Sequence, residues 1–110
     1  EARRDDLTPL MGLHFPSSDI PEQARRLYLL NTIRLIADVS TTPAALIPEQ
    51  NPLTGRPLDL SFSVLRSVSP VHVQYLKNMG AHTSMSVSLL REGRLWGLLS
   101  CMHYSGPRYM

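Results

Sequence analysis

The stretch HTSMSVSLLREGR, residues 82–94, shows the clearest secondary-structure pattern in the chain. Apolar side chains at positions 85, 87 and 89 alternate with serines at 84, 86 and 88, which is the two-residue period of a strand with one apolar and one hydroxyl face. Gly93 suits a tight turn, and residues 95–104 are mostly apolar. The pattern predicts an antiparallel hairpin whose second strand, with Trp96 in the core, is central in the sheet.

A further strand is predicted over residues 32–39, where β-branched residues alternate with other side chains. We expect the side that carries Ile33 to face the core, which places Arg34 on the opposite side. Residues 40–60 contain four prolines and are predicted to form a long surface loop, and residues 58–65 suit a helical turn. The long loop is itself a hint of function.

Two helices are predicted from end signals and apolar spacing. Residues 20–31 show helical spacing after an N-cap at Ser18 or Asp19. In a second helix, Ser69-Pro70 suits the N-cap and first position, and Gly80 suits the residue after the last turn. The resulting order of helices and strands predicts an α+β fold with an antiparallel sheet, and the small number of elements suggests a portion of a larger domain.

Composition excludes several classes of protein. The chain has 110 residues and a net charge of +2, and its basic residues are dispersed, so neither a nucleic-acid partner nor a second domain is expected. We find no apolar run of membrane-spanning length and no signal peptide. The single cysteine, Cys101, excludes an internal disulfide and points weakly to the cytoplasm.

Several polar side chains would converge on one pocket if the serine side of the 82–90 strand faces the helices. They are Tyr28, Arg34, Arg66, His72, Ser84 and Ser86. Arginine forks and hydroxyls are suited to carboxylates, so the pocket would bind a carboxylate-bearing ligand. Apolar walls for a flat ligand would come from Phe15, Val71, Tyr75 and Met102. In the alternative, the serines lie on a solvated sheet face and bind nothing.

Enzymatic and metal-binding interpretations find less support. The Gly-x-Ser-x-Gly elbow of a serine hydrolase is absent from the sequence. Alternation along a strand would separate Cys101 and His103 from Met102, and no second ligand pair has zinc-like spacing. We therefore expect Cys101 to be a buried thiol and this segment not to be an enzyme.

Three sequence blocks together resemble a known family. They are FPSSDIPEQAR at 15–25, LRSVSPVH with YLKNMG at 65–80, and GRLWGL at 93–98. The chain resembles the chromophore-binding GAF domain of a bacterial phytochrome over most of its length. The resemblance implies a GAF fold over residues 1–110, without its first strands and last helix, in which a central antiparallel sheet is flanked by helices. It also implies biliverdin, a linear tetrapyrrole, as cofactor, and red or far-red light sensing through double-bond isomerisation.

The resemblance assigns roles to residues that match the family's blocks. Asp19 and Ile20 match the motif beside the pyrrole rings, and His72 matches the histidine near the pyrrole nitrogens. Around one propionate the matching residues are Tyr28, Arg34, Arg66 and Ser69. Ser84 and Ser86 match hydroxyls near the other propionate. Phe15 and Tyr75 match aromatic walls around ring D.

Two positions depart from the family pattern. Val71 stands where plant and cyanobacterial relatives carry the attachment cysteine, so the covalent anchor is expected outside this chain, before a PAS domain. Met102 stands where the family usually has a histidine that donates to the ring D carbonyl. Methionine cannot donate a hydrogen bond, so we expect ring D to be less restrained and the photoproduct's stability or yield to differ.

The resemblance also predicts partners. It implies PAS and PHY domains in the same protein, a homodimer, and an output domain that is usually a histidine kinase. The alternative function is a GAF domain that binds a cyclic nucleotide or another small ligand, or that acts only in dimerisation.

Overall fold

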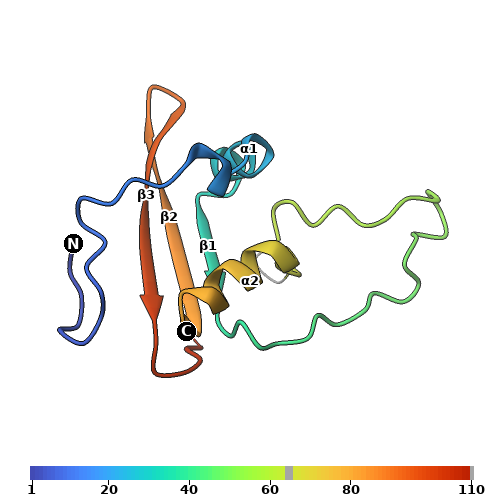
Figure 1. The fold of residues 1–110 in the computed structure, drawn as a ribbon. Helices are drawn as coiled ribbons and strands as arrows, with labels where there is room; N and C mark the ends of the chain where they lie inside the picture. Colours follow the sequence, from blue (N-terminus) through green and yellow to red (C-terminus); the bar gives the residue numbers. More distant parts are fainter. Residues whose placement is uncertain (64–65, 110) are drawn as a thin grey trace.

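A computed structural model describes residues 1–63 and 66–109 and confirms the α+β class (Figure 1). A short 3-10 helix η1, Ser17–Asp19, precedes helix α1, Glu22–Leu30, and strand β1, Ile33–Ile36. Helix α2, Pro70–Asn78, is followed by strand β2, Thr83–Arg91, and strand β3, Arg94–His103. The three strands form one antiparallel sheet in the order β1-β2-β3. The fold therefore has the element order that the sequence predicts.

The predicted hairpin is confirmed in its turn but corrected in its position. Glu92 and Gly93 have φ values of 51° and 73°, the positive pair of a type I′ turn that matches the twist of the strands. Among the described strands β2 is central and β3 lies at the edge, so the prediction of a central second strand is wrong. The apolar side chains of β3 reflect how its faces pack, and they do not show whether the strand is central or at the edge of the sheet.

The prediction of which side of β1 faces the core is also wrong. Ile33 is 58% exposed, whereas Ile36 is 8% exposed. The register pairs Arg34 with Ser86 and Ile36 with Ser84, so arginine, isoleucine and serines share one side of the sheet. The buried cluster lies on that side and comprises Ile36, Val39, Leu76 and Ala81, against which Met102 and Tyr104 pack.

Two residues expected in the core are exposed. Trp96 is 71% exposed, and the Cys101 thiol is exposed rather than buried. Both lie on β3, where Cys101 pairs with Met85 on the side of the sheet away from the buried cluster. For Cys101 the reason is again register, because alternate side chains of a strand point to opposite sides of the sheet. Trp96 lies where the β2–β3 register shifts between Leu89 and Leu90, so the alternation is interrupted there.

The helices form close to where they are predicted, but their caps differ. The 3-10 turn occupies the residues expected to cap α1, and Pro21 takes the N-cap position without a side-chain hydrogen bond. Ser69 is the N-cap of α2, yet its hydroxyl makes no capping bond, and Pro70 fills the first position as predicted. Gly80 has a φ of 71°, the left-handed conformation that ends the helix.

The long connection between β1 and α2 extends away from the sheet and helices (Figure 1). Its described residues contain no helix or strand beyond an isolated bridge between Gln50 and Pro57. Residues 58–63 are not helical, and the rest of the predicted turn at 64–65 lies outside the described residues. The start of the connection is fixed, because Thr83 Oγ1 donates to the Ala37 carbonyl at 2.9 Å.

Leu76→Ala tests the packing of α2 on the sheet. Leu76 is 1% exposed, so its truncation should lower the free energy of unfolding by about 2–5 kcal/mol. Leu53→Ala is the matched control, because Leu53 is 94% exposed and should change stability by less than about 0.5 kcal/mol. Urea unfolding followed by circular dichroism measures both, and equal effects would contradict this description of the core.

Candidate functional site

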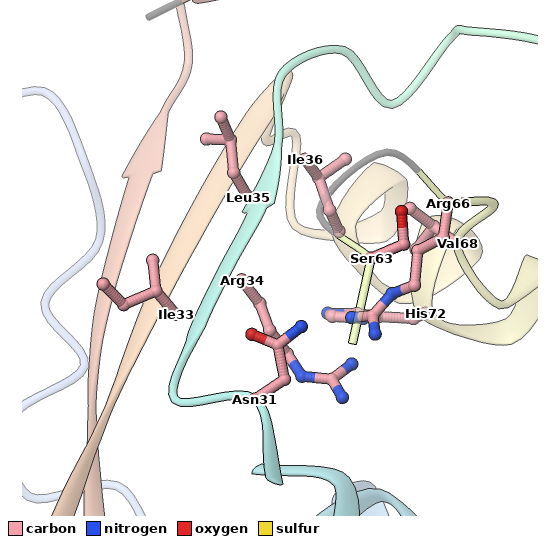
Figure 2. Close-up of a pocket in the computed structure, with 9 residues that line it drawn as sticks. All are labelled: Asn31, Ile33, Arg34, Leu35, Ile36, Ser63, Arg66, Val68 and His72. Carbon is pink, nitrogen blue, oxygen red and sulfur yellow. The ribbon is translucent and has the colours of Figure 1, made fainter. Parts of the chain in front are cut away.

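A small pocket lies between β1, the N-terminal end of α2 and the segment that precedes α2 (Figure 2). It is lined by Asn31, Ile33, Arg34, Leu35, Ile36, Ser63, Arg66, Val68 and His72. Its volume is about 30 Å³, room for roughly one water molecule. The side chains of Arg34, Arg66 and His72 point toward one another in it. No acidic side chain is among the described residues that line it.

Arg34 is half-buried, and part of its guanidinium lacks hydrogen-bond partners among the described residues. Its Nε and Nη2 atoms are buried without a partner among the described residues. The guanidinium carbon lies 4.9 Å from the ring centroid of Tyr28, a buried residue of α1, which places the cation over an aromatic face. Ser88 Oγ donates to the Tyr28 carbonyl at 2.8 Å and ties α1 to the sheet. Buried donor atoms without a partner are uncommon in folded proteins, so these two atoms mark a candidate site for an acceptor.

The electrostatics of the pocket are uniformly positive. Burial lowers the pKa of Arg34, and the neighbouring Arg66 lowers it further. Burial also lowers the pKa of His72, with Arg34 as the second cause, which favours the neutral imidazole. Arg66 Nη1 donates to the Ser61 carbonyl at 3.3 Å. Two guanidiniums and a neutral histidine form an environment that an anionic group would stabilise.

A second, more open pocket has a volume of about 440 Å³. It is lined by Phe15, Pro16, Ser17, Asp19, Ile20, Arg25, Tyr75, Leu95, Trp96, Gly97 and Leu98. Tyr75 follows His72 by three residues on α2, and residues at this spacing are neighbours on a helix surface. One helix therefore contributes to both pockets, a polar one and a largely apolar one.

The structure brings most of the predicted site residues together in two groups. Arg34, Arg66 and His72 line the small pocket, with Tyr28 stacked on Arg34. The open pocket contains Phe15, Asp19, Ile20 and Tyr75. Across the sheet, Ser84 is 7% exposed and Ser86 is half-buried beside Arg34, so the solvated-serine alternative does not hold for Ser84.

Three predicted residues lie elsewhere. Ser69 is exposed at the start of α2 and is not among the lining residues of either pocket. Met102 packs against the buried cluster. Val71, predicted as a pocket wall, is 80% exposed and lines neither pocket. Asn31 and Ser63 also line the small pocket but were not predicted to do so. In the sequence, Asn31 is marked only by its position after a helix and Ser63 only by its position in a loop.

Other site types find no support in the described part of the chain. Its His, Cys, Asp and Glu side chains form no group of three that could hold a metal ion. None of its helices is both long and apolar enough to cross a membrane.

Residues 6–109 match the GAF domain, and the chain belongs to the GAF domain family. It is 58% identical over 105 residues to a bacteriophytochrome of Pseudomonas aeruginosa and 50% identical over 110 residues to cyanobacterial phytochrome B of Nostoc sp.. These matches cover 96% and 100% of this chain but 14% of each relative. The predicted resemblance to bacterial phytochrome GAF domains is thereby confirmed.

Solved structures agree with this assignment. The chromophore-binding domain of an unusual bacteriophytochrome from R. palustris has a TM-score of 0.92 at 51% identity, over 98% of this chain and 36% of that chain. A variant chromophore-binding domain of a Stigmatella aurantiaca bacteriophytochrome has a TM-score of 0.87 at 56% identity, over 98% and 35%. The chain thus spans about a third of each solved domain that it matches.

Arg34→Gln should raise the pKa of His72. The substitution removes a neighbouring positive charge, so the pKa moves up toward the ordinary value of 6.5 while burial still opposes protonation. An NMR titration of the His72 imidazole measures the change. Arg25→Gln, on the exposed face of α1, is the matched control and should leave the midpoint in place.

The same substitution should change the pH dependence of stability. The unfolded chain binds a proton at His72 more readily than the folded protein, so the folded state loses stability as the pH falls below about 6.5. This loss should be smaller in Arg34→Gln than in the unmodified protein. Urea unfolding at pH 5.5 and pH 7.5 measures the difference, and an equal loss in both proteins would contradict the coupling of the two residues.

Proposed function

We propose that this chain is the bilin-binding part of a red and far-red light sensor. The observation that carries the proposal is the Arg34 guanidinium, whose buried Nε and Nη2 have no partner among the described residues, in a pocket with Arg66 and His72. The similarity to bacteriophytochromes supports a linear tetrapyrrole as the ligand, and biliverdin is the form we propose. When bound, biliverdin would absorb red light and isomerise about a double bond.

The chemistry of the residues present fits such a ligand. A bilin has two propionates on a flat, largely apolar conjugated system. Arg34 and Arg66 would hold one propionate by charge-assisted hydrogen bonds, with Tyr28 beneath Arg34, and Ser84 and Ser86 would serve the other. Ser69, exposed at the start of α2, would join the first group only when the ligand is bound. Phe15, Ile20, Tyr75 and Met102 would bound the rings, with Asp19 at the rim.

His72 would act through its neutral form. The lowered pKa keeps the imidazole uncharged near pH 7, so one ring nitrogen donates and the other accepts. A neutral ring in the same pocket as two guanidiniums adds no repulsion and can hydrogen-bond pyrrole nitrogens. Binding would also bring a carboxylate to charges that are otherwise uncompensated, and the protein would gain stability from the ligand.

The covalent anchor would come from outside this chain. Val71 offers no nucleophile, and Cys101 lies on the side of the sheet away from Arg34 and His72. A cysteine elsewhere in the whole protein, ahead of a PAS domain, fits this arrangement. We further propose PAS and PHY domains, a homodimer, a cytoplasmic location and a histidine kinase output, while this segment itself catalyses no reaction.

Biliverdin binding by the whole protein is the direct test. A red-absorbing band that changes reversibly under red and far-red light is expected, and a cyclic nucleotide should not compete with it. Absence of the band would reject the proposal in favour of a GAF domain for another small ligand or for dimerisation.

Arg34→Gln should weaken biliverdin binding by roughly tenfold to a hundredfold, because charge-assisted hydrogen bonds to a carboxylate are lost. Titration of the absorption band measures the affinity. Arg26→Gln provides the control, because Arg26 pairs with Glu22 at 2.6 Å on the exposed side of α1. Equal affinities in the two variants would exclude Arg34 from the site.

A further inference from the structure

The two guanidiniums of the small pocket have hydrogen-bond donors that the described chain does not use fully. Arg34 Nε and Nη2 are buried and have no acceptor among the described residues. Arg66 Nη1 donates to the Ser61 carbonyl at 3.3 Å, which is longer than the usual range of about 2.7–3.2 Å for such a bond. The side chains of Arg34, Arg66 and His72 point toward one another (Figure 2). The pocket therefore presents donors to whatever lies between the two arginines.

The charge of these donors favours an anion over a water molecule. Burial and then the neighbouring Arg66 lower the pKa of Arg34, so the two cations repel each other, and none of the described lining residues is acidic. A water molecule could accept hydrogen bonds here but would leave both charges uncompensated. A monovalent anion accepts the same bonds and offsets one charge. Ile36 and Val68 are apolar parts of the wall, and an apolar surrounding strengthens this attraction.

The volume of the pocket indicates which kind of anion fits. The volume is about 30 Å³, room for roughly one water molecule. Chloride is a single atom only slightly larger than water. A carboxylate, phosphate or sulfate group has at least three heavy atoms, so it enters only if Arg34 and Arg66 move apart. The pocket as the structure shows it thus matches a halide ion without rearrangement.

We propose that the pocket between Arg34 and Arg66 binds a chloride ion in the chromophore-free protein, and that this chloride competes with a carboxylate of the bilin. The halide site needs only the residues of the pocket, whereas the competition rests on the proposed function. A propionate directed to Arg34 has to displace the ion. Chloride therefore weakens biliverdin binding, by about twofold when its concentration equals its own dissociation constant.

Thermal unfolding of the chromophore-free whole protein tests the halide site. The melting temperature should be higher in sodium chloride than in sodium gluconate of equal ionic strength, because gluconate is too large for the pocket and equal ionic strength removes differences in general screening. The difference should disappear in Arg34→Gln and in Arg66→Gln. It should remain in Arg26→Gln, whose arginine pairs with Glu22 on the exposed side of α1. Because the two salts are compared within each variant, a stability change caused by the substitution itself cancels.

Bromide in place of chloride locates the ion. In crystals of the chromophore-free whole protein grown with sodium bromide, an anomalous scattering peak is expected beside Arg34 Nε and Nη2. A water molecule at that position, with no anomalous peak, would overturn the halide site.

Titration of biliverdin in the same two salts tests the competition. Affinity should be lower in chloride than in gluconate for the unmodified protein and equal in the two salts for Arg34→Gln. Equal melting temperatures in the two salts, in a protein that forms the light-responsive band, overturn this inference alone. A chloride effect that Arg34→Gln abolishes, in a protein that never forms the band, supports the halide site and overturns both the proposed function and the competition.

Discussion

The register between β1 and β2 couples the burial of Ile36 to the placement of Arg34. Because Arg34 pairs with Ser86 and Ile36 pairs with Ser84, the two side chains leave the sheet on the same side. The chain cannot bury the isoleucine against α2 without carrying the guanidinium inward as well. The result is a positive charge whose Nε and Nη2 atoms are desolvated and unpartnered among the described residues. A packed core and a cationic pocket are thus built from one strand.

An uncompensated buried charge is destabilising, and the surrounding residues limit its cost rather than remove it. The Tyr28 ring faces the guanidinium, and the pKa shifts of Arg34 and His72 both favour less charge in the pocket. A carboxylate partner from the chain itself would have been the more stable solution, yet no acidic side chain is among the described lining residues. Such a departure from optimal stability is typical of functional sites.

Local features were predictable from the sequence, and features set by pairing were not. The hairpin at residues 91–94 and the end of α2 at Gly80 depend on a few adjacent residues, so both were predicted correctly. The core side of β1 and the central strand depend on register, which alternation alone leaves open. The same ambiguity reversed the expected burial of Cys101, whereas Trp96 lies where the β2–β3 register shifts and the alternation is interrupted. Arg34, Arg66 and His72 were predicted as a group because their chemistry is distinctive, whereas Asn31 and Ser63 carry no such signal.

Helix α2 shows why the site and the core cannot be separated. Leu76, at 1% exposure, fixes the helix on the sheet, and His72 lies one turn earlier on the same face. Tyr75 lies between them in sequence and lines the open pocket. A binding group is positioned precisely only when its element is held by packing. The buried leucine therefore sets the direction of the histidine and the tyrosine.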